Sequence, residues 1–227
     1  MNSRHRGGRF GAWRVGAALV AGVLQGRAES PPPAPLVWML GVGDVVGGHP
    51  ALVLGAPRAA DHQKGIRFNG ENDGLILPVN PLAGWPAFTI EVLIRPQAGG
   101  APAQRFLHIE DDRGNRTLME IRMEADGRWC LDTFLLCGNQ RLTLIDRSRL
   151  HPPDQWQWVA LRCDGRKMDH FVNGVQELEG SVAFTPFGSG RMSLGVRLSR
   201  EYWFKGVLRE VRFHPAAVAA ENLQRVP

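Results

Sequence analysis

The stretch Ala87–Pro96, AFTIEVLIRP, alternates apolar and polar side chains over nearly its whole length. A period of two is that of a β-strand, whose successive side chains point to opposite faces. The positions on the apolar face are Phe88, Ile90, Val92 and Ile94. The stretch therefore predicts a strand with one face in a core and the other, carrying Thr89, Glu91 and Arg95, facing water.

Similar patterns recur along the rest of the chain. Arg191–Leu198, RMSLGVRL, again places its apolar residues at alternate positions, and the dipeptides Asp164-Gly165 and Asn173-Gly174 are typical of tight hairpin turns. We find no helical stripe of useful length before the last dozen residues. Short strands separated by turn residues predict an all-β fold, an antiparallel β-sandwich or barrel.

Positive charge is concentrated at the N-terminus. The 227-residue chain has a formal net charge of +5, but its first 28 residues hold five arginines and no acidic residue. Removing these five leaves 22 basic residues against 22 acidic ones. Because the remainder is neutral, we expect no nucleic-acid partner.

The N-terminal residues have the three parts of a secretory leader. The basic stretch RHRGGRFGAWR precedes the apolar run Val15–Leu24, and Gly26-Arg27-Ala28 offers a cleavage site. The apolar run is too short for a bilayer, which takes about 20 residues. We predict a signal peptide over residues 1–28, a Pro-rich spacer over 29–36, and a secreted or periplasmic product with no membrane span. An uncleaved anchor and a misassigned start codon are the alternatives.

Three cysteines, Cys130, Cys137 and Cys163, leave room for one disulfide and one free thiol in an oxidising compartment. Cys130 and Cys137 could close a small loop. On one unbroken strand, however, their odd spacing puts them on opposite faces. We favour buried free thiols, and no Cys/His spacing indicates zinc.

Four stretches in order carry a resemblance to a known family. They are GIRFNGENDGLILPV (65–79), AFTIEVLIRP (87–96), WQWVALRCDGRKMDHFVNGVQ (156–176) and WFKGVLREVRFHPAAV (203–218). Together they resemble the laminin-G-like members of the concanavalin A-like lectin/glucanase group. The resemblance implies a concanavalin A-like jelly roll of two antiparallel sheets over residues 37–215. A tail over 216–227, with one or two helical turns at most, follows it.

Two residues depart from the pattern of that family. Gly74 stands where relatives often have an aromatic residue after Asp73, and Arg209 stands where they often have an aspartate before Glu210. The second departure removes a carboxylate from the closing strand. It weakens any calcium site that the resemblance implies.

The stretch Met119–Glu124, MEIRME, raises the question of catalysis, because on a strand Glu120, Arg122 and Glu124 share one face. Catalytic relatives in the superfamily carry a carboxylate where Arg122 stands. A cation between two carboxylates should lower both pKa values and leave no general acid near neutral pH. We therefore expect a solvated, charge-paired strand face; a polar ligand groove and a glycoside hydrolase site are the alternatives.

Aromatic side chains could add a platform for sugar rings. The chain has seven tryptophans, a high count for its length, although each could instead belong to the core. The candidate ligand-binding residues are Arg122, Glu120, Glu124, Trp129, Tyr202 and Trp203.

Calcium is the one cofactor with candidate ligands. Asp73, Glu110 and Asp112 lie next to turn residues, where carboxylate oxygens could bind Ca²⁺. Their spacing matches no EF-hand loop, and turn-forming hydrogen bonds or a polar hairpin account for them as well. We therefore assign no metal and keep these three as weak calcium candidates.

These patterns together predict an exported binding module without catalytic residues, whose partner is a glycan or an extracellular protein. The alternative is a glycoside hydrolase or polysaccharide lyase of the same superfamily. A groove with two unneutralised carboxylates would favour the enzyme. A shallow groove lined by tryptophan and arginine would favour binding.

Overall fold

The computed structural model describes residues 1, 34–60 and 64–226. The expected signal peptide and most of the spacer lie outside the described residues. Strands dominate the described part, and a single turn of 3-10 helix, Ala220–Asn222, lies in the C-terminal tail where a helical turn was expected. None of the helices in these ranges is long and apolar enough to cross a membrane.

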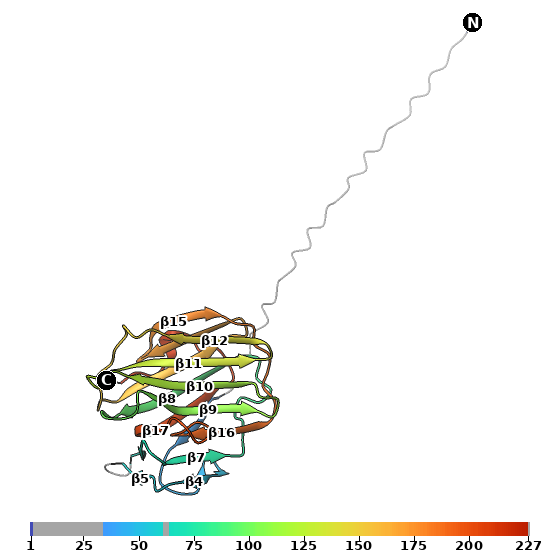
Figure 1. Cartoon of the computed structure of the whole chain (residues 1–227). Coiled ribbons are helices and arrows are strands. Elements are labelled where there is room, and N and C mark those ends of the chain that lie inside the picture. The colour runs from blue at the N-terminus through green and yellow to red at the C-terminus, as the bar shows by residue number, and fades with distance from the viewer. Residues whose placement is uncertain (2–33, 61–63, 227) are drawn as a thin grey trace. The chain divides into compact units, whose positions relative to one another are not determined.

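One antiparallel sheet has seven strands in the order β12-β11-β10-β9-β16-β7-β4, and these strands follow one another across the face seen in Figure 1. Their bounds are β4 (Leu52–Leu54), β7 (Gly74–Leu77), β9 (Ala103–Asp111), β10 (Arg116–Met123), β11 (Trp129–Cys137), β12 (Gln140–Ile145) and β16 (Gly190–Leu194).

The second antiparallel sheet has eight strands. Seven run in the order β15-β14-β13-β8-β17-β6-β5, and β1 also pairs with β17. Their bounds are β1 (Leu36–Met39), β5 (Arg58–Ala59), β6 (Ile66–Asn69), β8 (Phe88–Pro96), β13 (Gln157–Cys163), β14 (Lys167–Val172), β15 (Val175–Ser181) and β17 (Lys205–His214). A small ribbon of β2 (Val45–Val46) and β3 (His49–Pro50) stands apart.

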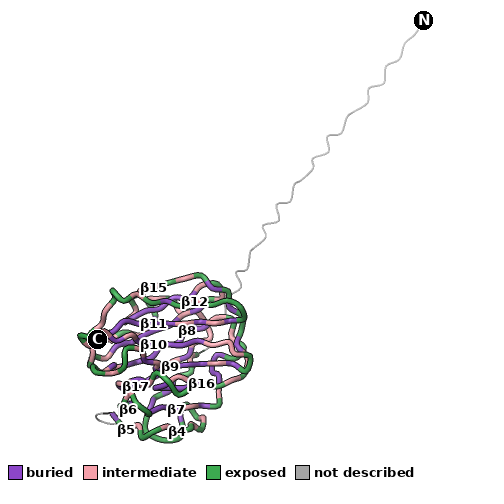
Figure 2. The backbone as a smooth tube through the Cα atoms, viewed as in Figure 1, coloured by how far each residue is buried: buried purple, intermediate pink, exposed green. Residues whose placement is uncertain are grey.

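The hydrophobic core consists of side chains from both sheets, and Figure 2 shows buried stretches along the strands and exposed connecting turns. Its largest fully buried side chains include Trp129, Phe68, Phe88 and Phe106. Apolar residues at alternate strand positions give each sheet one face to bury, and two such faces pack together. The predicted all-β antiparallel sandwich is confirmed.

The expected hairpin at Asn173-Gly174 is present between β14 and β15. Both residues have positive φ angles, 48° and 70°, as a type I′ turn requires. The asparagine side chain also accepts a hydrogen bond from the backbone N–H of Trp158, at 3.0 Å. The turn therefore fixes the register of β14 against β15 and is tied to β13.

The expectation of one alternating strand over Arg191–Leu198 is wrong in its second half. Strand β16 ends at Leu194 because Gly195 takes a φ angle of 76°, which breaks the extended conformation. Val196 and Leu198 are still buried, but they belong to the connection between β16 and β17. This connection, residues 195–204, is called the 195–204 loop below.

The polar face of β8 does not lie in water as expected. Glu91 is 1% exposed, and its carboxylate accepts a 2.6 Å hydrogen bond from the backbone N–H of Gln224 and pairs with His214 Nε2 at 2.8 Å. Thr89 Oγ1 accepts a hydrogen bond from the backbone N–H of Val218. The C-terminal residues therefore cover this part of the eight-stranded sheet.

All three cysteines are free and buried. Cys130 and Cys137 lie near opposite ends of the single strand β11. Cys137 and Cys163 belong to the core cluster between the sheets, and Cys130 does not. Burial raises the pKa of the Cys130 and Cys163 thiols to about 11, so both are protonated at neutral pH. The preference for buried free thiols is confirmed.

Candidate functional site

Strand β10 places the polar residues of the MEIRME stretch on the outer face of the seven-stranded sheet. Met119, Ile121 and Met123 belong to the core cluster, so the alternate residues Glu120 and Arg122 face away from it. The neighbouring strand β11 is in antiparallel register, and Asp132 stands directly opposite Glu120.

A hollow of about 170 Å³ lies on this outer face. It is smaller than the roughly 300–1,000 Å³ of most small-molecule sites, so it suits one sugar unit or one charged group of a larger ligand. The residues that line it are Arg105, Arg116, Leu118, Glu120, Arg122, Asp132, Phe134, Thr143 and Arg197.

Two arginines hold both carboxylates of the hollow in an ion-pair network. Arg105 Nε lies 2.9 Å from Glu120 Oε1, and Arg122 Nη2 donates to Glu120 Oε2 at 3.0 Å. Arg122 Nε donates to Asp132 Oδ2 at 2.6 Å. The predicted charge pairing of Arg122 with Glu120 is confirmed, but its second partner is Asp132, not Glu124.

Glu120 differs from the expected solvated carboxylate. It is 3% exposed, and burial raises its pKa, while the charges of Arg105 and Arg122 act in the opposite direction. Arg122 acts on this pKa in the predicted direction, but the predicted net lowering is wrong, because the loss of water outweighs the ion pairs. The sequence pattern predicted that Arg122 lies beside Glu120, but it did not predict that Glu120 is buried.

The 195–204 loop places an aromatic ring over Arg105, one of the residues that line the hollow. The Tyr202 ring lies over the Arg105 guanidinium, 3.6 Å from the ring centroid, and the Tyr202 carbonyl accepts a hydrogen bond from the Arg105 backbone N–H. Tyr202 is 43% exposed and has a φ angle of 59°. A half-exposed ring beside a charged hollow can offer a face to a sugar ring.

The other three candidates lie elsewhere. Glu124 follows the end of β10 and pairs with Arg147 Nη1 at 2.8 Å, outside the hollow. Trp129 is fully buried, and its Nε1 donates to the Pro152 carbonyl, so it is a core residue and offers no platform. Trp203 is half-buried and lies near Gly74, where a Cβ would come within 2.5 Å of the Val196 side chain and 3.4 Å of the indole.

Sequence reasoning missed most of the lining residues. Asp132 and Phe134 alternate with core residues on β11, so the period-two pattern could have placed them on the outer face. Arg105 stands opposite Glu120 across the β9–β10 hairpin, but the register shifts just before Glu120, so alternation alone does not place it. Arg197 comes from the 195–204 loop, which no local pattern pairs with β10. The position of Arg197 depends on the strand order, which puts β16 beside β9.

The weak calcium candidates do not converge. Asp73 accepts backbone hydrogen bonds from Ala56 at 2.8 Å and from Asn69 at 3.0 Å, which is a turn-forming role, although a hollow of about 440 Å³ lies beside it. Glu110 lies 3.6 Å from His108 Nε2. Among the residues that the structure describes, no group of three or more His, Cys, Asp or Glu is placed to hold a metal.

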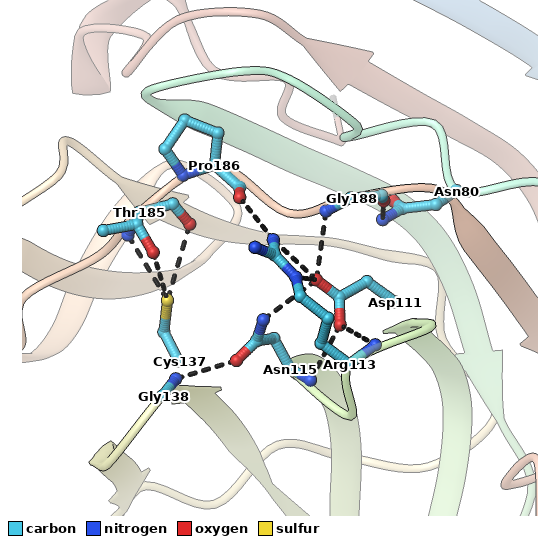
Figure 3. A network of polar contacts seen from close by, with 9 residues as sticks. All are labelled: Asn80, Asp111, Arg113, Asn115, Cys137, Gly138, Thr185, Pro186 and Gly188. Carbon is cyan, nitrogen blue, oxygen red and sulfur yellow. Dashed lines mark hydrogen bonds and ion pairs between the residues drawn. The ribbon is translucent and has the colours of Figure 1, made fainter.

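Asp111, between Glu110 and Asp112, has a structural role at the end of β9 (Figure 3). Its carboxylate accepts backbone hydrogen bonds from Arg113, Asn115 and Gly188 at 2.9–3.0 Å. Burial alone would raise its pKa, but these hydrogen bonds and that of the Asn115 side chain lower it to about 2. Asp111 thus joins the β9–β10 hairpin to the segment before β16.

Comparisons with known proteins agree with this architecture. The model of the concanavalin A-like lectin/glucanases superfamily matches residues 69–224, which is more than half of the chain. The chain therefore belongs to this superfamily. No curated protein matches the chain.

Solved structures share the fold at low sequence identity. Domain 4 of an extracellular GH43 arabinanase from Geobacillus stearothermophilus, solved with arabinotriose, superposes with a TM-score of 0.56 at 19% identity, covering 77% of this chain and 87% of that one. The receptor-binding domain of botulinum neurotoxin C/D mosaic serotype superposes with a TM-score of 0.62 at 12% identity, covering 83% of this chain. The ligand-binding domain of botulinum neurotoxin serotype D, solved with N-acetylneuraminic acid, superposes with a TM-score of 0.61 at 12% identity and covers 82% of this chain. The chain spans about half the length of these toxin domains.

Proposed function

We propose that the chain is a non-catalytic binding module whose ligand is a glycan. The observation that carries this proposal is the state of the two carboxylates in the hollow. Both carboxylate oxygens of Glu120 are already paired with an arginine, and Asp132 pairs with one of these two arginines, Arg122. Two-carboxylate hydrolysis requires one acid that can give up a proton and one carboxylate free to attack or to activate water.

The surroundings of the carboxylates support binding. The guanidinium groups of the hollow offer hydrogen-bond donors, and the rings of Phe134 and Tyr202 offer apolar faces. This combination of groups binds sugar rings. Several of the proteins with a similar fold were solved with glycans or their components, namely arabinotriose and N-acetylneuraminic acid. This similarity supports the ligand class and names no sugar for this chain.

A glycoside hydrolase is the second candidate, and one observation favours it. Burial raises the pKa of Glu120, which stands opposite Asp132, and a raised pKa is what a general acid needs. The same Glu120 must give up an arginine contact to become protonated at either oxygen. We therefore place catalysis second.

One panel experiment separates the two candidates. The purified chain is tested against a broad set of polysaccharides for retention and for release of reducing ends. We expect retention on at least one polymer and no cleavage of any. Cleavage that Glu120→Gln abolishes, and that Glu124→Gln outside the hollow leaves intact, would establish the hydrolase instead.

The module is also proposed to act outside the cytoplasm. The basic stretch, apolar run and cleavage site of residues 1–28 support export. Direct sequencing of the N-terminus of the product recovered from outside the cytoplasm should begin just after Ala28. A product that begins at Met1 would contradict cleavage.

A further inference from the structure

The hollow carries more positive charge than its own carboxylates neutralise. Four arginines and two acidic residues line it. Arg105 and Arg122 are engaged with Glu120 and Asp132. The other two guanidinium groups, those of Arg116 and Arg197, have no partner of that kind inside the hollow.

Arg116 and Arg197 are held in place by weak or neutral contacts. Arg116 Nη1 donates to the Gly114 carbonyl at 3.2 Å, and its guanidinium lies 5.6 Å from the centroid of the Phe134 ring. Arg197 has a single acidic neighbour among the described residues, the mostly exposed Glu201 at 4.0 Å. A pair at that distance in water is worth little, so both charges remain available to a ligand.

Arg105, which also lines the hollow, has a buried donor without an acceptor in the described ranges. Arg105 Nη1 is shielded from solvent and has no hydrogen-bond partner within the part of the chain that the structure describes. Buried donors in folded proteins nearly always have a partner, supplied by protein, water or ligand. Arg105 therefore has a donor that its ion pair with Glu120 does not use.

His108 lies near the same arginines. It is 1% exposed on β9, and its Nδ1 accepts a hydrogen bond from the backbone N–H of Leu198. Burial lowers its pKa, and the positive charges of Arg197 and Arg116, then those of Arg105 and Arg191, lower it further, to about 3. Four arginines therefore lie close enough to disfavour a charged His108, against the acidic neighbour Glu110, whose Oε2 lies 3.6 Å from His108 Nε2.

We propose that the hollow recognises an acidic sugar unit, with Arg116 and Arg197 binding its carboxylate or sulfate group and with Phe134 and Tyr202 contacting the ring. This inference rests on the proposed glycan-binding function and names the class of glycan. Planar guanidinium groups bind carboxylate and sulfate oxygens in pairs of hydrogen bonds. A neutral sugar would leave both arginines without an anion.

Two matched pairs of polymers test the charge requirement. Polygalacturonate is compared with its fully methyl-esterified form, and dextran sulfate with dextran, by titration calorimetry at about 0.15 M salt, where long-range attraction is screened. We expect at least one charged polymer to bind more than about tenfold more tightly than its neutral counterpart. Which charged polymer binds distinguishes a carboxylate from a sulfate.

Substitutions then assign the binding to the hollow. Arg116→Gln and Arg197→Gln should each weaken binding of the charged polymer by about tenfold or more. Arg166→Gln, which removes an exposed arginine from the β13–β14 turn on the other sheet, should leave it unchanged. Arg197 is partly exposed on the 195–204 loop, so its variant should fold even if the Arg116 variant does not.

The outcomes separate this inference from the proposed function. Equal affinity for charged and neutral polymers, or an equal loss with Arg166→Gln, would overturn the acidic-sugar inference and leave glycan binding in place. If neither Arg116→Gln nor Arg197→Gln weakens binding of the charged polymer, the inference is overturned as well. Failure to bind these polymers and every other polysaccharide of the panel would overturn both.

Discussion

Arg122 connects two neighbouring strands through charge. It donates through Nε to Asp132 on β11 and through Nη2 to Glu120 on its own strand. Both carboxylates are nearly inaccessible to water, with 2% and 3% of their surface exposed. At this depth an ionised carboxylate is costly without a partner.

Arg122→Ala should therefore destabilise the protein strongly. It leaves Asp132 buried without its cation, and breaking one side of a buried pair costs about 3 kcal/mol or more. Urea unfolding measures the loss of unfolding free energy. Arg128→Ala removes an arginine paired with Asp126 at the surface and should leave the midpoint unchanged. Equal midpoints for the two variants would mean that the Arg122 network contributes nothing.

Asp111 makes stability depend on pH in the acidic range. Its folded-state pKa of about 2 lies below the ordinary value of 3.8, so the folded protein favours the carboxylate. The stabilisation is complete above the unfolded pKa, near 4, and is lost as the pH falls through about 2. The shift corresponds to about 2 kcal/mol.

Asp111→Asn should remove that contribution. At pH 7 the variant should unfold with about 2 kcal/mol less free energy than the parent, because its amide places donors against backbone N–H groups. The difference should shrink as the pH falls from 4 towards 2. Urea unfolding at pH 7, 5 and 3 measures it, and a difference that stays constant would show that the charge of Asp111 has no part in it.

Among elements, the 195–204 loop decides the shape of the hollow. Gly195 begins it with a φ angle of 76°, and a Cβ at that position would lie 2.3 Å from the Phe68 ring. The loop then carries Arg197 to the hollow and places the Tyr202 ring over Arg105, which lines it. The turn at Gly195 thus depends on a core residue from the opposite sheet.

Gly195→Ala should be more harmful than the same change at Gly84. Gly84 has a similar φ angle of 81°, but a Cβ there meets no atom within 4 Å. Both variants place a non-glycine residue in the left-handed region, at a cost of about 1–2 kcal/mol. Gly195→Ala adds a clash with Phe68, so urea unfolding should show a larger loss. Equal losses would show that Phe68 moves aside freely.

Element boundaries show how far the sequence could predict this fold. Ala87–Pro96 was predictable as a strand, because its period of two is clean, and β8 spans Phe88–Pro96. The end of β16 at Leu194 was not, because Val196 and Leu198 remain buried and keep the alternation beyond the turn. Periodicity reports which side chains are buried and is silent on the path of the backbone between them.

The candidate site was predictable only in part for a related reason. Glu120 and Arg122 are neighbours on one strand, and local sequence reveals them. Asp132 and Arg105 join them across the neighbouring β10–β11 and β9–β10 hairpins, where the register decides which side chains meet. Arg197 joins them through loop packing, which a single sequence does not encode locally. Whether a polar residue on a strand is wet or buried depends on the same long-range packing.

On the scale of the molecule, both sheets have outer faces that are only partly wet. On the seven-stranded sheet, Glu120 and Asp132 are buried beneath arginines. On the eight-stranded sheet, the C-terminal residues cover Ala160 and Phe171, and Leu223 packs against both. Each sheet therefore buries apolar or ionic groups on both faces. Alternation along a strand predicts one buried face per sheet, and for that reason it wrongly placed Glu91 in water.

The C-terminal tail should for this reason be part of the folded unit. Leu223 is 5% exposed, and Leu223→Ala should lower the unfolding free energy by about 2–3 kcal/mol through lost burial. Removing residues 216–227 should cost more, because Glu91 also loses its hydrogen bond from Gln224. Val175→Ala, at a site 64% exposed, is the matched control and should change the free energy by less than about 0.5 kcal/mol. Urea unfolding of the three variants measures these changes in free energy. If the truncated chain is as stable as the parent, the tail contributes nothing to stability and the sandwich is complete at Pro215.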